Sequence, residues 1–328
     1  MNKKIVLIAG VVVLLLALLL GGLPLFSHLY YGRSQAATLF AWQLGKEAYT
    51  TPEAFADYLA QKRVENGGPY LLPEEAELTV PLTQGLYAGM QLFTLNPDAA
   101  GTKLIVYLPG GSYIDPPRAV HWSFLNALAE DADAAVLVPI YPKLPDHDAA
   151  ACLEALTAAY TAYLGETAPE ELIFMGDSAG GGLALSLAMT LRDAGLPRPE
   201  QLILICPWLD VTLTNPDIPA YEKKDPAIDS EQLRQLGALW ADTLDPADPR
   251  VSPLYGTFDG LGRITVLIGT GELLYPDAMV LDEALTQQGI DHDTAVWSGM
   301  FHVWPLYYGY SIPEAEEAYQ YILQTVVD

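Results

Sequence analysis

The sequence is poor in positive charge and in cysteine, and each shortage excludes a class of protein. Lys and Arg number 16 against 41 Asp and Glu, which gives a formal net charge of −25 at pH 7. This charge repels phosphate, so it excludes nucleic acid as a partner and opposes electrostatic attachment to anionic lipids. The 2 cysteines, Cys152 and Cys206, are too few for a disulfide framework or a cysteine-based metal site. Each lies in an apolar run, where we expect a reduced thiol that acts as a small hydrophobe.

The composition is that of a globular chain with one long apolar run at its N-terminus. Hydrophobic residues make up 51% of the 328 residues and charged residues 17%, which excludes a disordered protein and allows a sizeable core. Lys3 and Lys4 precede the uncharged run 5–26, whose 22 residues would span roughly 33 Å as a helix, enough for a bilayer core of about 30 Å. Residues 5–20 are aliphatic, Ala or Gly throughout, so a helix here has no polar face.

We therefore expect residues 1–30 to be a transmembrane signal anchor. The two lysines would stay in the cytoplasm, so the rest of the chain would lie outside the cell membrane, with a single pass through it. A cleaved signal peptide is the alternative, because a charged start and an apolar run are common to both. In that case the mature protein would be secreted.

Beyond the run, the hydrophobic pattern is that of an α/β protein. Two short strand-like runs, separated at Gln84 and Gly85, lie between residues 78 and 95. Strand-like and helical runs then alternate, and the strands are apolar throughout, which predicts a mostly parallel sheet with helices on both faces. The expected strands are 104–108, 135–139, 172–175, 202–206, 264–269 and 294–297, and the expected helices are 118–130, 148–164, 179–194, 276–288 and 313–327.

Two segments are expected to form a helical cap over this catalytic domain, residues 76–328. In the first, residues 31–75, a helical pattern runs from Gln35 to Val64 and breaks and restarts at Thr51, as expected of an N-cap. The segment 210–253, rich in Pro, Asp and Thr, departs from the strand–helix alternation and is expected to be an insertion. The candidate substrate contacts beneath the cap are aromatic, although such residues are more often plain core: Tyr113, Trp208 and Trp240.

A candidate nucleophile, Ser178, lies between the strand 172–175 and the helix 179–194. It is the central residue of Gly176-Asp177-Ser178-Ala179-Gly180, a Gly-x-Ser-x-Gly sequence in the strand–turn–helix context that this motif requires. A serine at such a sharp turn has a strained backbone, and the flanking glycines allow strand and helix to approach without Cβ clashes. The helix N-terminus can stabilise negative charge beside its hydroxyl. We therefore predict a serine hydrolase.

The base is expected after this serine, because the partners follow in the order serine, acid, histidine. His292 stands between two aspartates before the last strand, where a solvated surface residue is expected. His302 follows that strand, at the carboxyl edge of the sheet where α/β sites form. We predict that His302 is the general base.

The acid is expected in the loop after the strand 264–269. Glu272 is the first carboxylate there, and its expected role is to orient the imidazole of His302 and to stabilise the imidazolium. Asp277 and Asp282 are rivals, but each falls in or at the start of the next helix.

A glycine pair, Gly110 and Gly111, directly follows the strand 104–108 and its Pro109. Two glycines at this point allow backbone N–H groups to turn inward as oxyanion donors, beside the N–H of Ala179. Alone this pair indicates only a turn, and it gains meaning from the nucleophile motif.

These motifs resemble the hormone-sensitive-lipase branch of the α/β-hydrolase esterases, from about residue 80 to the C-terminus. The glycine pair lies where the branch has His-Gly-Gly-Gly, but Pro109 replaces its His and Ser112 its frequent third Gly, which affects loop orientation and the shape of the acyl site. The usual acid, an Asp followed by Pro, is Glu272 here, as in some bacterial subgroups. The other similar segments are Gly176-Asp177-Ser178-Ala179-Gly180-Gly181, Tyr141-Pro142-Lys143-Leu144-Pro145 and Pro207-Trp208-Leu209-Asp210.

The sequence thus predicts an enzyme of the α/β-hydrolase fold that cleaves carboxylic esters of short- to medium-chain acids through an acyl-enzyme. The expected substrate is a small-molecule or lipid-like ester, and no metal or organic cofactor is implied. An amidase or a cell-envelope deacetylase could use the same three residues. A catalytically silent binding module is a further alternative, against which the intact set of Ser, Glu and His argues. The sequence does not predict an oligomeric state.

Overall fold

An eight-stranded sheet forms the centre of the computed structural model, which describes residues 4, 8, 10–11, 21–46, 49 and 51–328. The strand order is β1-β2-β4-β3-β5-β6-β7-β8. The β1–β2 and β2–β4 pairs are antiparallel, and all later neighbours are parallel. The strands are β1 (Leu82–Tyr87), β2 (Met90–Leu95), β3 (Lys103–Leu108), β4 (Ala135–Pro139), β5 (Glu171–Asp177), β6 (Gln201–Ile205), β7 (Arg263–Gly269) and β8 (His292–Trp297).

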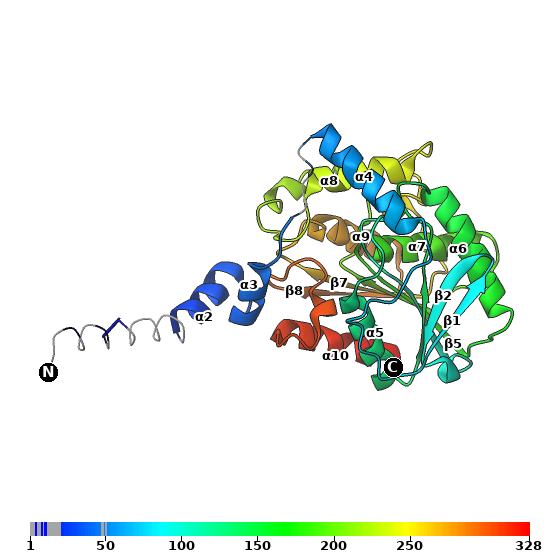
Figure 1. Cartoon of the computed structure of the whole chain (residues 1–328), viewed down its shortest axis with the longest axis horizontal. Coiled ribbons are helices and arrows are strands. Elements are labelled where there is room, and N and C mark those ends of the chain that lie inside the picture. The colour runs from blue at the N-terminus through cyan, green and yellow to red at the C-terminus, as the bar shows by residue number, and fades with distance from the viewer. Residues whose placement is uncertain (1–3, 5–7, 9, 12–20, 47–48, 50) are drawn as a thin grey trace.

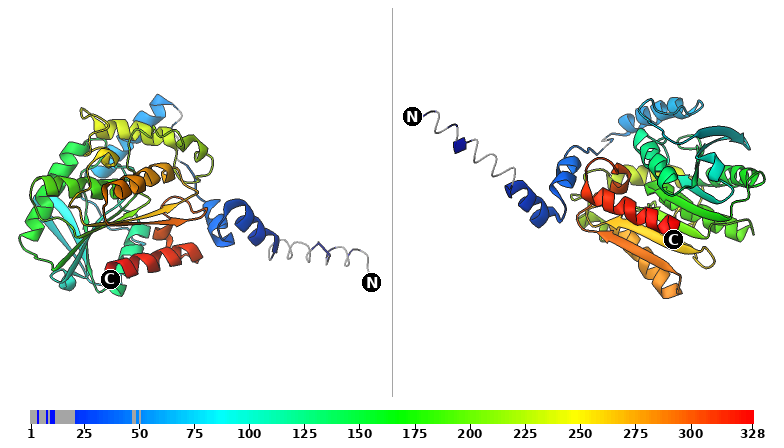
Figure 2. Two further views of the ribbon diagram at one scale, coloured as in Figure 1. Left: turned by 180° about the vertical axis from the view of Figure 1, so that it is seen from behind. Right: turned by 90° about the horizontal axis from the view of Figure 1, so that it is seen from below.

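Helices cover both faces of this sheet (Figures 1 and 2). One face carries α5 (Ala119–Asp131) and α10 (Pro313–Val327). The other carries α6 (Ala149–Leu164), α7 (Ser178–Asp193) and α9 (Tyr275–Gln288). Because both faces are covered, the central strands are buried along almost their whole length, which explains why their sequences are apolar rather than alternating. The predicted mostly parallel sheet with helices on both faces is confirmed.

The structure corrects the expected break between the first two strands. Gln84 and Gly85 lie inside β1, paired with Phe93 and Leu92 of β2, and the chain turns at residues 88–89 instead. Both turn residues have positive φ, 47° and 84°, as a two-residue hairpin between twisted strands requires. Glycine at position 85 serves packing rather than turning, since a Cβ there would lie 2.7 Å from the ring of Tyr87.

Each of the two expected cap segments contains a helix, and both helices lie at the same end of the molecule (Figure 1). The first, α4 (Pro52–Asn66), begins at Thr51, whose side chain accepts a hydrogen bond from Ala54 N as an N-cap. The second, α8 (Ser230–Ala241), belongs to the segment 210–253, which also contains the short helix η4 (Ile218–Ala220). Sequence position alone separates these helices by more than a hundred residues, and the fold brings them to one side of the sheet.

Residues 23–31 form a helical stretch that projects from the body of the molecule (Figures 1 and 2). It consists of α2 (Leu23–Phe26) and η2 (Ser27–Tyr31), is followed by α3 (Gln35–Ala41), and exposes Leu25 and Leu29. Among the described residues, no helix is both long enough and apolar enough to span a bilayer. More than half of the expected anchor lies outside these residues, at 1–3, 5–7, 9 and 12–20, so the anchor stays a prediction.

Candidate active site

Ser178 stands at the turn between β5 and α7. The strand ends at Asp177 and the helix begins at Ser178 itself, so the direction of the chain reverses at the serine. Its φ is +52°, a left-handed conformation that costs a non-glycine residue on the order of 1–3 kcal/mol. The turn is tight because two glycines lack side chains: a Cβ on Gly180 would lie 2.0 Å from Leu108 O, and one on Gly176 2.4 Å from Gly180 O. The strain is therefore held in place by close backbone packing.

His302 and Glu272 complete a continuous chain of hydrogen bonds that starts at this serine. His302 Nε2 lies 2.8 Å from Ser178 Oγ, and His302 Nδ1 lies 2.7 Å from Glu272 Oε2. The second carboxylate oxygen, Oε1, accepts from Gly269 N at 3.0 Å, which fixes the carboxylate at the end of β7. The exposed fractions are 9% for Ser178, 5% for His302 and 0% for Glu272, so these three hydrogen-bonded side chains are almost fully shielded from bulk water.

The charges around His302 favour its protonated form. Burial by itself lowers the pKa of His302, but the hydrogen bond and charge of Glu272, together with the charges of Asp225 and Asp177, raise this pKa above its usual value. A more basic imidazole is a better acceptor for the proton of a hydroxyl group. The arrangement can therefore activate Ser178 as a nucleophile.

The structure corrects the expectation that the N–H of Gly110 faces an oxyanion. This N–H donates to Asp177 Oδ1 at 2.8 Å, and the same oxygen accepts from Tyr107 OH at 2.7 Å. Burial raises the pKa of Asp177, but contacts with His121, Tyr107 and this N–H outweigh it and lower the pKa below its usual value. The carboxylate is therefore ionised, and its hydrogen bond from Gly110 N helps to fix the loop 110–112.

The next backbone donors in this loop are at Gly111 and Ser112, which both border the cavity beside Ser178. Their φ angles are +133° and +52°, so the backbone turns sharply at both residues. Within the described part of the chain, neither N–H donates a hydrogen bond, and the same is true of Ala179 N in the first turn of α7. These three N–H groups are available for a negatively charged oxygen at the serine.

A cavity of about 200 Å³ lies beside Ser178 and His302. The loop 110–112 and residues of the two cap segments form its walls, including Leu44 and Tyr58 from the N-terminal part and residues 227–229 and 232–233 from the insertion. Ligand pockets usually measure 300–1,000 Å³, so this cavity fits only a small group beside the serine.

The three aromatic residues predicted as substrate contacts do not line the cavity beside Ser178, so that prediction is wrong. Tyr113, Trp208 and Trp240 are buried and do not border the cavity. The Tyr113 ring stacks between the two tryptophans, with centroid distances of 5.2 Å to Trp208 and 4.1 Å to Trp240. Because Tyr113 follows the loop 110–112 and Trp240 belongs to α8, the stack joins the cap to that loop.

The rival residues from the sequence lie away from His302. Asp277 borders a separate cavity of about 830 Å³, where Oδ1 accepts from Asn215 Nδ2 at 2.9 Å and burial raises its pKa to about 6. Asp282 Oδ1 lies 3.5 Å from Nε2 of His292, so these two rivals contact each other. Neither carboxylate bonds to His302.

One residue near the site was missed by sequence reasoning. Asp225, in the segment 210–253, is buried, and its Oδ2 accepts from Leu273 N at 2.8 Å, directly beside Glu272. A single aspartate in a segment already rich in aspartate and proline gives no signal of burial, so the sequence could not have identified it.

Within the described residues, one group of three side chains has the spacing of metal ligands: Cys206, Glu272 and His302, with ligand atoms within 4.8 Å. The histidine and the glutamate are already bonded to each other at 2.7 Å, and an ion would have to break that bond. Cys206 Sγ accepts from Val303 N at 3.3 Å, and burial raises the pKa of this thiol. Both cysteines are free and buried, as predicted from the sequence.

Comparisons with known proteins point to one family. Residues 105–306, which include Ser178, Glu272 and His302, match a family described as having the alpha/beta hydrolase fold. The chain is 32% identical over 225 residues to an acetyl-hydrolase of Streptomyces hygroscopicus, covering 68% of this chain and 75% of that protein. It is 30% identical over 242 residues to an esterase of Acinetobacter venetianus, covering 73% and 80%. A crystal structure of an esterase from the bacterial hormone-sensitive lipase family matches with a TM-score of 0.74 at 25% identity, covering 89% and 96%.

Proposed function

The chain belongs to the α/β-hydrolase fold family, as a carboxylic ester hydrolase of the hormone-sensitive-lipase-like branch, and we propose that it works through an acyl-enzyme on Ser178. The observation that carries this proposal is the hydrogen-bond chain from Ser178 through His302 to Glu272, at 2.8 and 2.7 Å. Nucleophile, base and orienting acid within such distances are the requirement for this chemistry.

Acylation begins when Ser178 Oγ attacks the ester carbonyl carbon and its proton passes to His302 Nε2. The carbonyl oxygen becomes an oxyanion in the tetrahedral intermediate. When the intermediate collapses, the bond to the alcohol oxygen breaks, and the alcohol leaves with the proton from His302. Water then attacks the acyl carbon while His302 takes its proton, and the bond to Oγ breaks as His302 returns that proton to Oγ, so the carboxylic acid is released and Ser178 is restored.

Glu272 accepts the hydrogen bond of His302 Nδ1–H, which leaves Nε2 free to take the serine proton and stabilises the imidazolium that forms. The oxyanion is stabilised by the N–H groups of Gly111, Ser112 and Ala179, because Gly110 N already donates to Asp177. Their preorganisation matters, since a fixed N–H in a site closed to water needs no reorientation as charge develops.

The acyl group is proposed to be short. A cavity of about 200 Å³ beside Ser178 leaves room for an acetyl or butyryl group but not for a long chain. One relative is named an acetyl-hydrolase, which is in line with this size. The measurement is kcat/KM on p-nitrophenyl esters of increasing acyl length. We expect a maximum at acetate to butyrate and a steep fall by laurate.

The chain is also proposed to be anchored by residues 1–30, with its catalytic domain outside the cell membrane. The support is the uncharged run 5–26 after Lys3 and Lys4, in which Leu25 is exposed, followed by exposed Leu29 and Tyr30 on the projecting helical stretch. Tyrosine at the end of an apolar run suits the interface between hydrocarbon and water. A cleaved signal peptide and a secreted enzyme remain the alternative outcome.

The test of the reaction is Ser178→Ala with a fluorophosphonate probe. We expect loss of labelling and a fall in ester hydrolysis of up to about 10⁶-fold, with an unchanged circular dichroism spectrum. Ser123→Ala is the matched control, because this exposed serine of α5 should keep both signals. Wild-type turnover by the Ser178 variant would refute the mechanism, and faster cleavage of an anilide than of the ester with the same acyl group would favour an amidase.

A further inference from the structure

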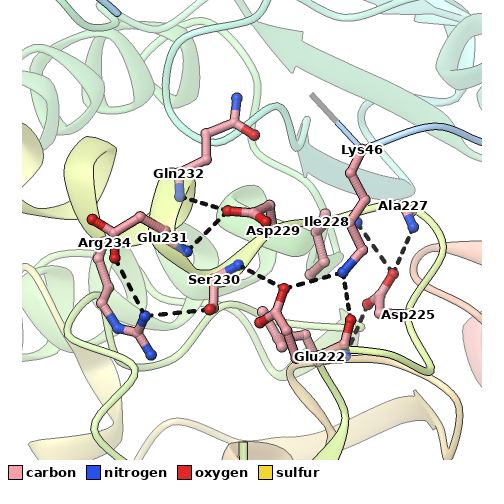
Figure 3. A network of polar contacts seen from close by, with 11 residues as sticks. Lys46, Glu222, Asp225, Ala227, Ile228, Asp229, Ser230, Glu231, Gln232 and Arg234 are labelled. Carbon is pink, nitrogen blue, oxygen red and sulfur yellow. Dashed lines mark hydrogen bonds and ion pairs between the residues drawn. The ribbon is translucent and has the colours of Figure 1, made fainter. Parts of the chain in front are cut away.

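Asp225 is a buried carboxylate in the cap insertion, with an exposed fraction of 2%. Its Oδ1 accepts from the backbone N–H groups of Ala227 at 2.7 Å and Ile228 at 3.1 Å (Figure 3). Ala227 and Ile228 both border the cavity beside Ser178. One oxygen of Asp225 therefore shapes the part of the cap that faces the substrate.

The other oxygen of Asp225 reaches across to the main domain. Oδ2 accepts from Leu273 N at 2.8 Å, and Leu273 follows Glu272 directly in the chain. The two residues are 48 positions apart, so this hydrogen bond is a tertiary contact between the insertion and the loop after β7. A single side chain thus connects the cavity wall to Leu273, the residue next to Glu272.

The charge of Asp225 also bears on His302. The charged groups that act on the imidazole come from three elements: Glu272 after β7, Asp177 at the end of β5 and Asp225 in the cap. Among the described residues, no Lys or Arg side chain forms an ion pair with Asp225, and its oxygens are bonded only to backbone N–H groups. Burial raises the pKa of Asp225, and the charge of His302 opposes this. The imidazolium formed during catalysis is therefore the positive charge that this carboxylate can stabilise.

The segment that carries Asp225 is fixed by further polar contacts (Figure 3). Lys46 Nζ, from the N-terminal part of the chain, lies 3.1 Å from Glu222 Oε1, and that oxygen also accepts from Ser230 N at 3.5 Å. Asp229 accepts from Gln232 N at 3.0 Å and so caps α8. These contacts lie on both sides of Asp225 in the sequence and limit how far its carboxylate can move.

We propose that Asp225 is a positioning residue that ties the cap to the catalytic acid loop and adds negative charge beside His302, so that cap placement and the basicity of the histidine depend on one side chain. This inference rests on the proposed mechanism and extends it to a residue that touches neither substrate nor the serine. None of the motif segments identified in the sequence includes this position.

The test compares Asp225→Asn with the wild-type enzyme in the full chain. The Asn side chain can still accept from Ala227 N through its oxygen. Its NH₂ group cannot accept from Leu273 N, and the side chain has no negative charge to act on His302. We expect kcat/KM for p-nitrophenyl acetate to fall between about tenfold and a hundredfold. The acidic limb of its pH profile should move to lower pH, because removal of a negative charge lowers the pKa of His302.

Asp245→Asn is the matched control, since Asp245 also accepts a backbone N–H within the insertion, from Ala247 at 2.9 Å, but is exposed and distant from the cavity wall. It should leave both kcat/KM and the pH profile unchanged. A loss of thermal stability in Asp225→Asn with an unshifted acidic limb would overturn the proposal and leave Asp225 a structural residue only. So would wild-type kinetics.

A second variant, Asp225→Glu, covers the case in which Asp225→Asn does not fold. It keeps the negative charge but displaces the carboxylate, so we expect an acidic limb near that of the wild type with a reduced kcat. If neither variant folds, the carboxylate acts in stability and the proposal is overturned. Failure of the mechanism itself is recognised separately, because fluorophosphonate labelling would then persist in Ser178→Ala whatever Asp225 does.

Discussion

At the scale of single residues, the proposed mechanism makes the activity of Ser178 depend on a carboxylate that does not contact the serine. Glu272 is fully buried and bonds to His302 Nδ1 at 2.7 Å. In the proposed mechanism its charge orients the imidazole and offsets the cost of forming a buried imidazolium. Glu272→Gln keeps the shape and removes the charge, and we expect kcat for p-nitrophenyl acetate to fall about 10⁴-fold. Asp277→Asn is the control and should cost far less, because Asp277 bonds to Asn215 in a different cavity. A larger loss of kcat in Asp277→Asn than in Glu272→Gln would show that the assignment of Glu272 as the acid is wrong.

The protonation of His302 predicts how activity depends on pH. In the proposed mechanism, His302 must be neutral to accept the serine proton, and neighbouring carboxylates raise the pKa of His302 above its usual value. We therefore expect kcat/KM to fall as the pH decreases through a midpoint above about 6.5, the ordinary value for histidine. Glu272→Gln should move this midpoint to lower pH, since it removes the strongest source of negative charge. Both profiles are measured from initial rates in buffers of constant ionic strength. A wild-type midpoint below the ordinary value would contradict the electrostatic account.

At the scale of secondary-structure elements, hydrophobic pattern and turn chemistry were sufficient to predict most of the sheet. The strand 135–139 and the helix 313–327 have the bounds expected from the sequence, because an apolar run or a proline at the first helical position marks them. The hairpin at residues 88–89 was misplaced, since glycine inside β1 gave the same signal as a turn. Ser178, Glu272 and His302 could be named from motif order, but the other side-chain contacts made by tertiary packing could not be predicted. For example, no local sequence pattern indicates that Asp177 accepts the hydrogen bond of Gly110 N.

The aromatic stack between the cap and the main domain is another tertiary feature, and it has a measurable consequence for stability. Trp240 of α8 is fully buried and lies 4.1 Å from the Tyr113 ring, centroid to centroid. Trp240→Ala should lower the free energy of unfolding by about 3–5 kcal/mol, because it removes a large buried ring and leaves a cavity. Trp42→Ala is the matched control at an exposed position, with an expected change within about 0.5 kcal/mol. Denaturant unfolding followed by circular dichroism measures both, and equal effects would show that the stack contributes nothing.

At the scale of the whole molecule, the N-terminal segment is joined to the loop that carries His302. Arg33 has an exposed fraction of 5%, and its Nη1 donates to Gly299 O at 2.9 Å, three residues before the histidine. A Cβ on Gly299 would lie 1.8 Å from Tyr31 O, so the two backbones are in direct contact. Ser34 Oγ donates to Glu314 Oε2 of α10 at 2.8 Å. Residues 31–34, just before α3, are therefore packed against the main domain, whether or not residues 5–26 span a membrane.

This contact sets the point at which the N-terminus can be removed. The full-length protein should fractionate with membranes and stay there in high salt and carbonate, because insertion of residues 5–26 relies on apolar burial, which salt does not weaken. Deletion of residues 1–30 should release a soluble enzyme with kcat/KM close to that of the full chain, since Arg33 and Ser34 remain. Deletion of residues 1–34 removes the Arg33–Gly299 and Ser34–Glu314 contacts, so we expect a lower melting temperature and a lower kcat. Equal activity and stability in the two deletions would show that the segment is dispensable, and a full-length protein extracted by carbonate would rule out the anchor.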